Sequence, residues 1–216
     1  MQQVHPKRRE SGAVVVIEQP STPTRSETWN DPDSVATAVP ACALPDEIAG
    51  QRLQPLRFAC AESEREAWQA IARQHQTVEE PPFEVRPGMR SAAGVVTIEP
   101  DGRIWIVHPT NRFADYSATF PKGSVEEGRS LQTTAIVECF EESGLLVRIV
   151  GFLGDFDRSA SRTRYYIAER IGGSPADMGW ESQAVSLVPR SELPALLTSP
   201  HDRPVLAAID LEVPAA

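Results

Sequence analysis

One segment, residues 120–145, limits what this chain can fold into more than any other part of the sequence. It predicts a single strong helix over about 130–143, bounded by a serine and a glycine. Glu138, Glu141 and Glu142 are spaced i, i+3 and i+4, which places the three carboxylates within an arc of roughly 100° on one helix face. Three like charges on one face repel each other, so this face is either solvated by water or holds a divalent cation.

The ends and the opposite side of this helix are also marked. Ser130 is the expected N-cap, and Gly144 is the expected residue after the C-terminus. The other side of the helix is apolar and predicts packing against a sheet; it carries Ile136, Val137, Cys139 and Phe140.

The elements around the helix do not follow a regular βαβ alternation. The sequence therefore predicts an α+β domain over 88–213. Pro100-Asp101-Gly102 indicates a hairpin between the first two strands. The expected strands are 92–98, 103–108, 145–150, 162–171 and 184–188, and the expected short helices are 191–197 and 203–211.

The residues before this domain have a different texture, and 11 of the 19 prolines fall in the first 100 residues. Residues 1–40 are polar and turn-forming, which predicts a flexible leader, with an export or docking tail as a further alternative. Residues 41–87 predict a small, partly helical extension, with a helix over 61–75 and an extended linker at Pro81-Pro82.

Composition excludes some classes of function. The 21 Lys and Arg against 30 Asp and Glu give a net charge of −9, which disfavours binding to long nucleic acid. Three cysteines without a CxxC pair predict a reducing compartment, and we expect a cytoplasmic protein. The basic cluster Lys7-Arg8-Arg9 precedes an apolar run of only 13–17, too short for a signal peptide or a membrane span.

The segment that contains the helix resembles the box of the Nudix hydrolase family, G-x5-E-x7-R-E-U-x-E-E-x-G-U, with U aliphatic. The resemblance runs from about residue 93 to residue 211, and the first 87 residues lie outside it. It implies a mixed-sheet α/β/α sandwich with a partly flexible N-terminal extension. The matching positions are Gly123, Glu138, Glu141, Glu142, Gly144 and Leu145.

Two positions depart from the box. Arg129 stands where the family has its first glutamate, and Val137 stands where it has arginine. Arg129 cannot bind a metal, so we expect a reduced or altered number of metal ions rather than an inactive site. Glu126 or Glu127 is a candidate to replace the missing carboxylate in part.

The resemblance implies hydrolysis of a pyrophosphate bond in a nucleoside diphosphate linked to another group. Mg²⁺, with Mn²⁺ as the alternative ion, would be held by Glu138, Glu141, Glu142 and the carbonyl of Gly123. Glu181 is our candidate for the catalytic base, with an ordinary exposed loop acid as the alternative. ADP-ribose-type and dinucleoside polyphosphate substrates rank equally, and a nucleoside triphosphate ranks third.

Phosphate binding requires positive charge despite the net acidity. The candidates are Lys122, Arg158, Arg162 and Arg164, with Tyr165 to stack on a base. The alternatives are a solvated strand face for the arginines and a core position for the tyrosine. We expect a small nucleotide as partner, no long nucleic acid and no membrane, and the sequence leaves a homodimer open. A catalytically weakened, nucleotide-binding regulatory module is the competing function.

Overall fold

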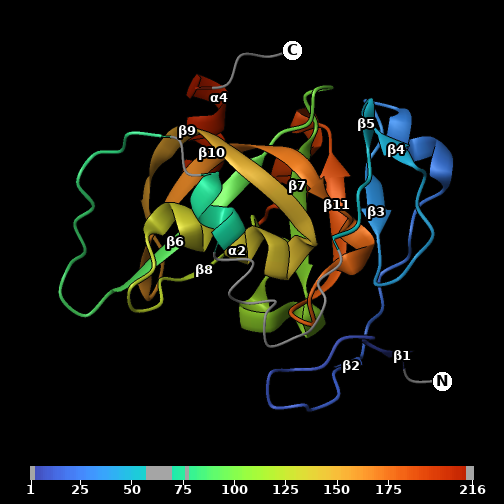
Figure 1. Ribbon diagram of the computed structural model, residues 1–216, viewed down its shortest axis with the longest axis horizontal. Coiled ribbons are helices and arrows are strands. Elements are labelled where there is room, and N and C mark those ends of the chain that lie inside the picture. Colours follow the sequence, from blue (N-terminus) through green and yellow to red (C-terminus); the bar gives the residue numbers. More distant parts are fainter. Residues whose placement is uncertain (1–2, 57–69, 76–77, 213–216) are drawn as a thin grey trace.

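A computed structural model describes residues 3–56, 70–75 and 78–212. Two sheets and one long helix dominate the chain (Figure 1). The four-stranded sheet has the order β8-β6-β10-β9, and the three-stranded sheet has the order β3-β11-β7. Their bounds are Lys122–Ser124 for β8, Arg90–Thr97 for β6, Ser161–Gly173 for β10, Leu145–Asp157 for β9, Ala36–Ala38 for β3, Ser182–Val188 for β11 and Ile104–Pro109 for β7.

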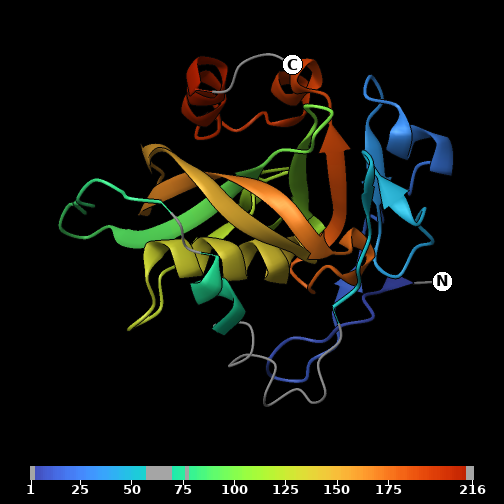
Figure 2. The same ribbon diagram turned by 45° about the horizontal axis from the view of Figure 1, so that its top comes forward.

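Helices lie on both sides of the sheets, which makes the α/β/α sandwich that the sequence predicts. Figure 2 shows α2 (Leu131–Ser143) on one side and the C-terminal helices α3 (Leu193–Leu196) and α4 (Arg203–Glu212) on the other. Strand β6 contributes to a core on each side, because Val95 packs with the α2 cluster and Val96 with the cluster of the C-terminal helices. Short 3₁₀ turns complete the fold at Ser26–Asn30, Thr110–Asp115, Pro175–Asp177 and Arg190–Glu192.

The expected hairpin between the first two strands is wrong in its pairing. The turn itself forms, because Gly102 N–H donates to the carbonyl of Glu99 at 2.9 Å. Only the isolated bridge Ile98–Ile104 joins the two sides, and then β6 and β7 diverge into different sheets. Each strand finds a partner distant in sequence: β6 pairs in parallel with β10, and β7 pairs antiparallel with β11.

The expectation of a flexible leader is corrected for residues 26–39. Strand β3 pairs antiparallel with β11 and extends the three-stranded sheet. Trp29 is 1% exposed and its ring centroid lies 6.0 Å from that of Trp105. The buried guanidinium of Arg103 donates to the carbonyls of Thr28, Trp29 and Ser34. Residues 26–39 are therefore held by the buried ring of Trp29 and by backbone carbonyls that accept hydrogen bonds from Arg103. Neither kind of contact produces a hydrophobic period in the sequence.

The remaining N-terminal elements are short. They are β1 (Gln3–Val4), β2 (Val16–Ile17), β4 (Glu47–Ile48) and β5 (Gln51–Arg52). Residues 70–74 are helical, and the rest of the helix expected over 61–75 lies outside the described residues. Within the described ranges, no helix is long and apolar enough to cross a membrane.

Candidate active site

Helix α2 begins and ends where the sequence predicts. The Ser130 hydroxyl accepts a hydrogen bond from the N–H of Thr133 at 3.1 Å, which is an N-cap. Gly144 has φ of 74°, and its N–H donates to the carbonyl of Phe140 at 2.7 Å. A Cβ at this position would lie 2.2 Å from the carbonyl oxygen of Ser174, so the helix end requires glycine for both conformation and space.

Gly123, on β8, leaves room for the carboxylate of Glu138, the first of the three glutamates on the helix. A Cβ built on Gly123 would lie 2.1 Å from the carboxyl carbon of Glu138. The absence of a side chain therefore lets the Glu138 carboxylate lie against the β8 backbone. This contact joins Gly123 and Glu138, two positions that the resemblance to the Nudix box assigns to one metal site.

Glu142 lies one helical turn further on and is tied to the same strand. Its carboxylate accepts a hydrogen bond from the N–H of Lys122 at 2.9 Å. Burial raises the pKa of Glu142 to about 7, although the positive charge of Lys122 and this hydrogen bond act in the opposite direction.

Glu181 reaches the same region from the loop before β11. The N–H of Gly179 donates to the carbonyl of Glu141 at 2.8 Å, and a Cβ on Gly179 would lie 2.1 Å from that oxygen. The loop is held on its other side because Thr110 N–H donates to the carbonyl of Glu181 at 2.7 Å. Burial raises the pKa of the Glu181 carboxyl, and the nearby Glu10 adds to this effect.

The four acids form one electrostatic group. Burial, and after it the negative charges of Glu142, Glu141 and Glu181, together raise the pKa of Glu138 to about 9. Oxygen donors that repel each other without a matching cation suit a divalent ion such as Mg²⁺. In the described part of the chain, the side chains as placed do not converge into a group of three or more His, Cys, Asp or Glu ligands around one point. The donor chemistry thus fits a metal ion, and closing the ligand set needs side-chain movement.

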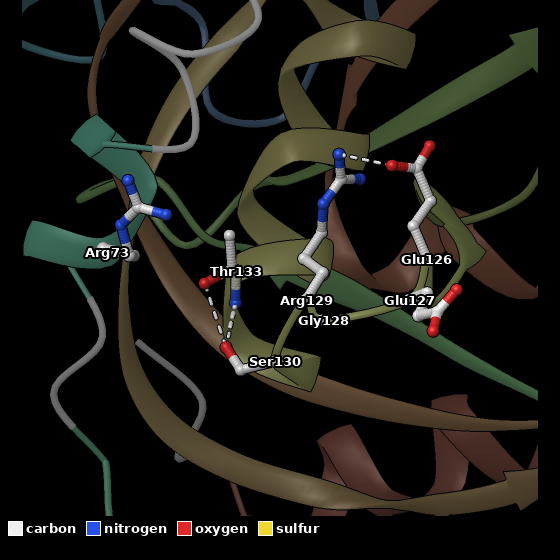
Figure 3. A pocket seen from close by; sticks show the side chains of 7 residues that line it. All are labelled: Arg73, Glu126, Glu127, Gly128, Arg129, Ser130 and Thr133. Carbon is white, nitrogen blue, oxygen red and sulfur yellow. Dashed lines mark hydrogen bonds and ion pairs between the residues drawn. The ribbon is translucent and has the colours of Figure 1, made fainter.

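Arg129, the first departure from the box, lies at the other end of the helix. It forms an ion pair with Glu126 at 2.9 Å, its side chain is 6% exposed, and its charge lowers the pKa of Glu138. Glu126 is thus paired with Arg129 and Glu127 is exposed, so neither takes the place of the missing carboxylate in this conformation. Figure 3 shows these side chains around a cavity of about 220 Å³, which is lined by Arg73, Glu126, Glu127, Gly128, Arg129, Ser130 and Thr133.

The arginines expected to bind phosphate are engaged elsewhere. The side chain of Arg164 is 1% exposed. Its guanidinium donates two hydrogen bonds of 2.7 and 2.8 Å to the carboxylate of Asp155 and one of 2.7 Å to the carbonyl of Pro81. Arg158 is buried and donates to Asp202 at 3.0 Å and to the Tyr165 hydroxyl at 3.2 Å. The structure thus gives both arginines structural partners rather than an open phosphate site. Arg162 remains partly exposed and pairs with Asp157 at 2.7 Å.

Tyr165 has no ring face open to a base, because its side chain is fully buried. Tyr116 is an aromatic residue beside Lys122, and the sequence analysis did not single it out. Lys122 Nζ lies 5.5 Å from its ring centroid and the guanidinium of Arg158 lies 5.2 Å away. Of the predicted phosphate ligands, Lys122 alone is placed beside the carboxylates, through its backbone contact with Glu142.

The comparisons with known proteins agree with this geometry. The NUDIX domain model matches residues 88–209. The chain is 34% identical over 98 residues to an RNA pyrophosphohydrolase of Caulobacter vibrioides, which covers 45% of this chain and 54% of that protein. It is 30% identical over 100 residues to the putative mutator protein MutT4 of Mycobacterium tuberculosis, covering 43% of this chain and 40% of that protein. The chain thus matches about half the length of these curated relatives.

A solved structure shows the same fold. The NUDIX hydrolase from Nitrosomonas europaea superposes with a TM-score of 0.50 at 18% identity, over 59% of this chain and 74% of that one. The sandwich fold is that of a NUDIX hydrolase. The family match spans more than half of the chain, and the protein belongs to the Nudix family.

Proposed function

We propose that this protein is a divalent-metal-dependent pyrophosphohydrolase acting on a nucleoside diphosphate linked to a further group. The observation that carries the proposal is the gathering of Glu138, Glu142 and Glu181 around the end of α2, where burial first and neighbouring negative charges second raise the pKa of each carboxyl. Like charges held close together are costly, and carboxyl groups with raised pKa values gather where a cation or a proton transfer needs them. Membership of the family of Nudix hydrolases supports the same chemistry.

The four acids divide between two tasks in this proposal, metal binding and proton transfer. Glu138, Glu141 and Glu142, with the Gly123 carbonyl, would hold Mg²⁺ or Mn²⁺. When bound, such an ion polarises a phosphoryl oxygen and acidifies a water molecule. The N–H of Lys122 orients the Glu142 carboxylate, and the close contact with the Gly123 backbone orients the Glu138 carboxylate.

Glu181 is proposed as the catalytic base. It lies on a loop whose position is fixed by the Gly179 and Thr110 hydrogen bonds. A carboxylate with a raised pKa is a stronger base than an ordinary glutamate, so it takes a proton from the attacking water more readily. Glu138 shares this property and is the second candidate.

The substrate is proposed to be a small nucleotide. ADP-ribose-type and dinucleoside polyphosphate compounds are the candidates that the family resemblance suggests, and the name of the Caulobacter relative, RNA pyrophosphohydrolase, adds RNA as a further candidate. We infer a cytoplasmic location from the cysteine pattern, and Cys42 and Cys139 are free thiols.

The test is a turnover panel. Purified full-length protein is given ADP-ribose, diadenosine polyphosphates, nucleoside triphosphates and a 5′-triphosphorylated oligoribonucleotide, with Mg²⁺, with Mn²⁺ and with chelator. Products are identified by mass. Cleavage between phosphorus atoms that stops in chelator supports the proposal. Tight binding of one compound without turnover of any would favour the regulatory module and contradict the enzyme.

A further inference from the structure

Residues 3–17 form a hairpin that packs onto the Nudix domain. Strands β1 and β2 pair antiparallel, and His5 N–H donates to the carbonyl of Val15 at 2.9 Å. His5, Val15 and Ile17 are buried, at 2%, 5% and 2% exposure. A hairpin of this size is marginal alone, so these buried side chains show that it depends on the domain.

Polar side chains of the domain hold the hairpin from outside. The amide of Asn111 donates to the carbonyl of Val16 at 2.8 Å and accepts from the N–H of Glu18 at 2.8 Å. The amide of Gln183 donates to the carbonyl of Gln19 at 2.9 Å. Both amides belong to the segments that flank Glu181 in space, so the hairpin is fixed to the wall of the acid site.

The tip of the hairpin lies next to Glu181. A turn at Arg9–Ala13 is closed by hydrogen bonds of 2.8 and 3.0 Å, and the guanidinium of Arg9 lies 5.0 Å from the ring centroid of Trp180. The charges of Arg9 and Glu10 both act on the Glu181 carboxyl. Lys7 lies on the same side, 5.9 Å from the ring centroid of Phe140.

Arg9 differs from the arginines of the sheet in its partners. Arg158 and Arg164 are buried in ion pairs, whereas Arg9 is exposed and has no ion pair with any residue in the described ranges. A guanidinium resting on an indole keeps its outward N–H groups available for a second, anionic partner. A polyphosphate approaching four carboxylates in a protein of net charge −9 needs such a cation.

We infer that the N-terminal hairpin is a wall of the substrate site and that Arg9 is a phosphate-binding residue, held in place by Trp180. The inference rests on the proposed function for its ligand, a nucleotide phosphate group. It assigns a role to the basic cluster 7–9, which lies outside the matched family domain.

The test compares three substitutions in the full chain. Arg9→Ala removes charge and stacking, Arg9→Gln removes only the charge, and Arg9→Lys retains the charge. Arg86→Ala is the matched control, because Arg86 is an exposed arginine paired with Asp157. Hydrolysis of the best panel substrate is followed at low and high salt, and melting temperatures are recorded.

The inference predicts that Arg9→Ala and Arg9→Gln raise KM about tenfold, the loss of one charged hydrogen bond, with kcat nearly unchanged. Arg9→Lys should recover most of this loss, and both neutral variants should reduce the salt dependence of KM. Unchanged KM in Arg9→Gln, or an equal rise in Arg86→Ala, overturns the inference. A lowered melting temperature with poor recovery in Arg9→Lys would instead assign Arg9 a structural role.

A binding measurement separates this inference from the proposed function. Titration calorimetry with ADP-ribose and with pyrophosphate in Mg²⁺ is run on the same variants. Binding without turnover in the unmodified protein contradicts the proposed enzyme and still tests Arg9 through the ratio of Kd values. No binding of either compound and no turnover contradicts both.

Discussion

Charged side chains are arranged in opposite ways on strand β10 and around the end of α2. On β10, Arg164 and Arg170 each meet a carboxylate, Asp155 and Glu99, within 2.7 Å. Around the end of α2, Glu138, Glu142 and Glu181 lie near other carboxylates, and burial together with these negative charges raises the pKa of each of the three. The ion pairs on β10 hold segments of the chain together, whereas the like charges around the end of α2 suit a cationic ligand. The arginines that the sequence analysis singled out on β10, Arg162 and Arg164, thus have carboxylate partners, and the glutamates of α2 remain the candidates for chemistry.

The largest expected effect concerns the ion pair between Glu99 and Arg170 of β10. Glu99→Ala should lower the free energy of unfolding by about 3–5 kcal/mol, because it leaves the buried guanidinium of Arg170 without its carboxylate. Arg170 also donates to the carbonyl of Ile48, so the N-terminal extension should loosen as well. Chemical denaturation measures the change. Glu169→Ala, in an exposed pair with Arg148, is the control and should change little.

Among the acids around the end of α2, Glu181→Gln should lower kcat about a hundredfold and leave the folding stability equal or higher. The amide cannot accept the proton from water, and its neutrality removes repulsion from the acid group. Steady-state kinetics and thermal melting are measured together. Glu127→Gln, at an exposed position on the cavity of Figure 3, is the control. An unaltered kcat in Glu181→Gln would leave Glu138 as the remaining candidate for the base.

A third effect concerns pH. The pKa of Glu138 is raised from 4.5 to about 9, so the folded state binds its proton more tightly than the unfolded state. Stability without metal should therefore fall as pH rises through this window, and the melting temperature in chelator should drop between about pH 6 and about pH 8.5. Glu138→Gln should flatten this slope. A slope of the same size in Glu138→Gln would show that the raised pKa of Glu138 does not govern it.

The smallest effect returns to β10. Arg162→Ala breaks a partly exposed pair with Asp157 and should cost less than about 1 kcal/mol, with KM unchanged. Arg162 was expected to bind phosphate, so its kinetics sharpen the contrast with Arg9. A KM that rises as much as in Arg9→Ala would restore Arg162 as a phosphate ligand.

The sequence predicted what depends on local pattern. The ends of α2 follow from Ser130 and Gly144, and the gathering of its glutamates follows from helical spacing. It failed where partners are distant in the chain. The carbonyls that bind Arg103, the sheet partner of β3 and the contact of Arg9 with Trp180 join residues 69 or more positions apart. Neither composition nor periodicity records such pairings, so a well-packed N-terminal segment resembled a flexible one.

The central claim is that the carboxylates at the end of α2 bind a divalent cation. Titration calorimetry of Mn²⁺ and Mg²⁺ into the metal-free protein and into Glu142→Gln tests it most directly. The account predicts saturable binding in the unmodified protein and an affinity lowered about tenfold or more in Glu142→Gln, because a neutral amide oxygen replaces a charged ligand. Equal affinity and stoichiometry in the two proteins would contradict it.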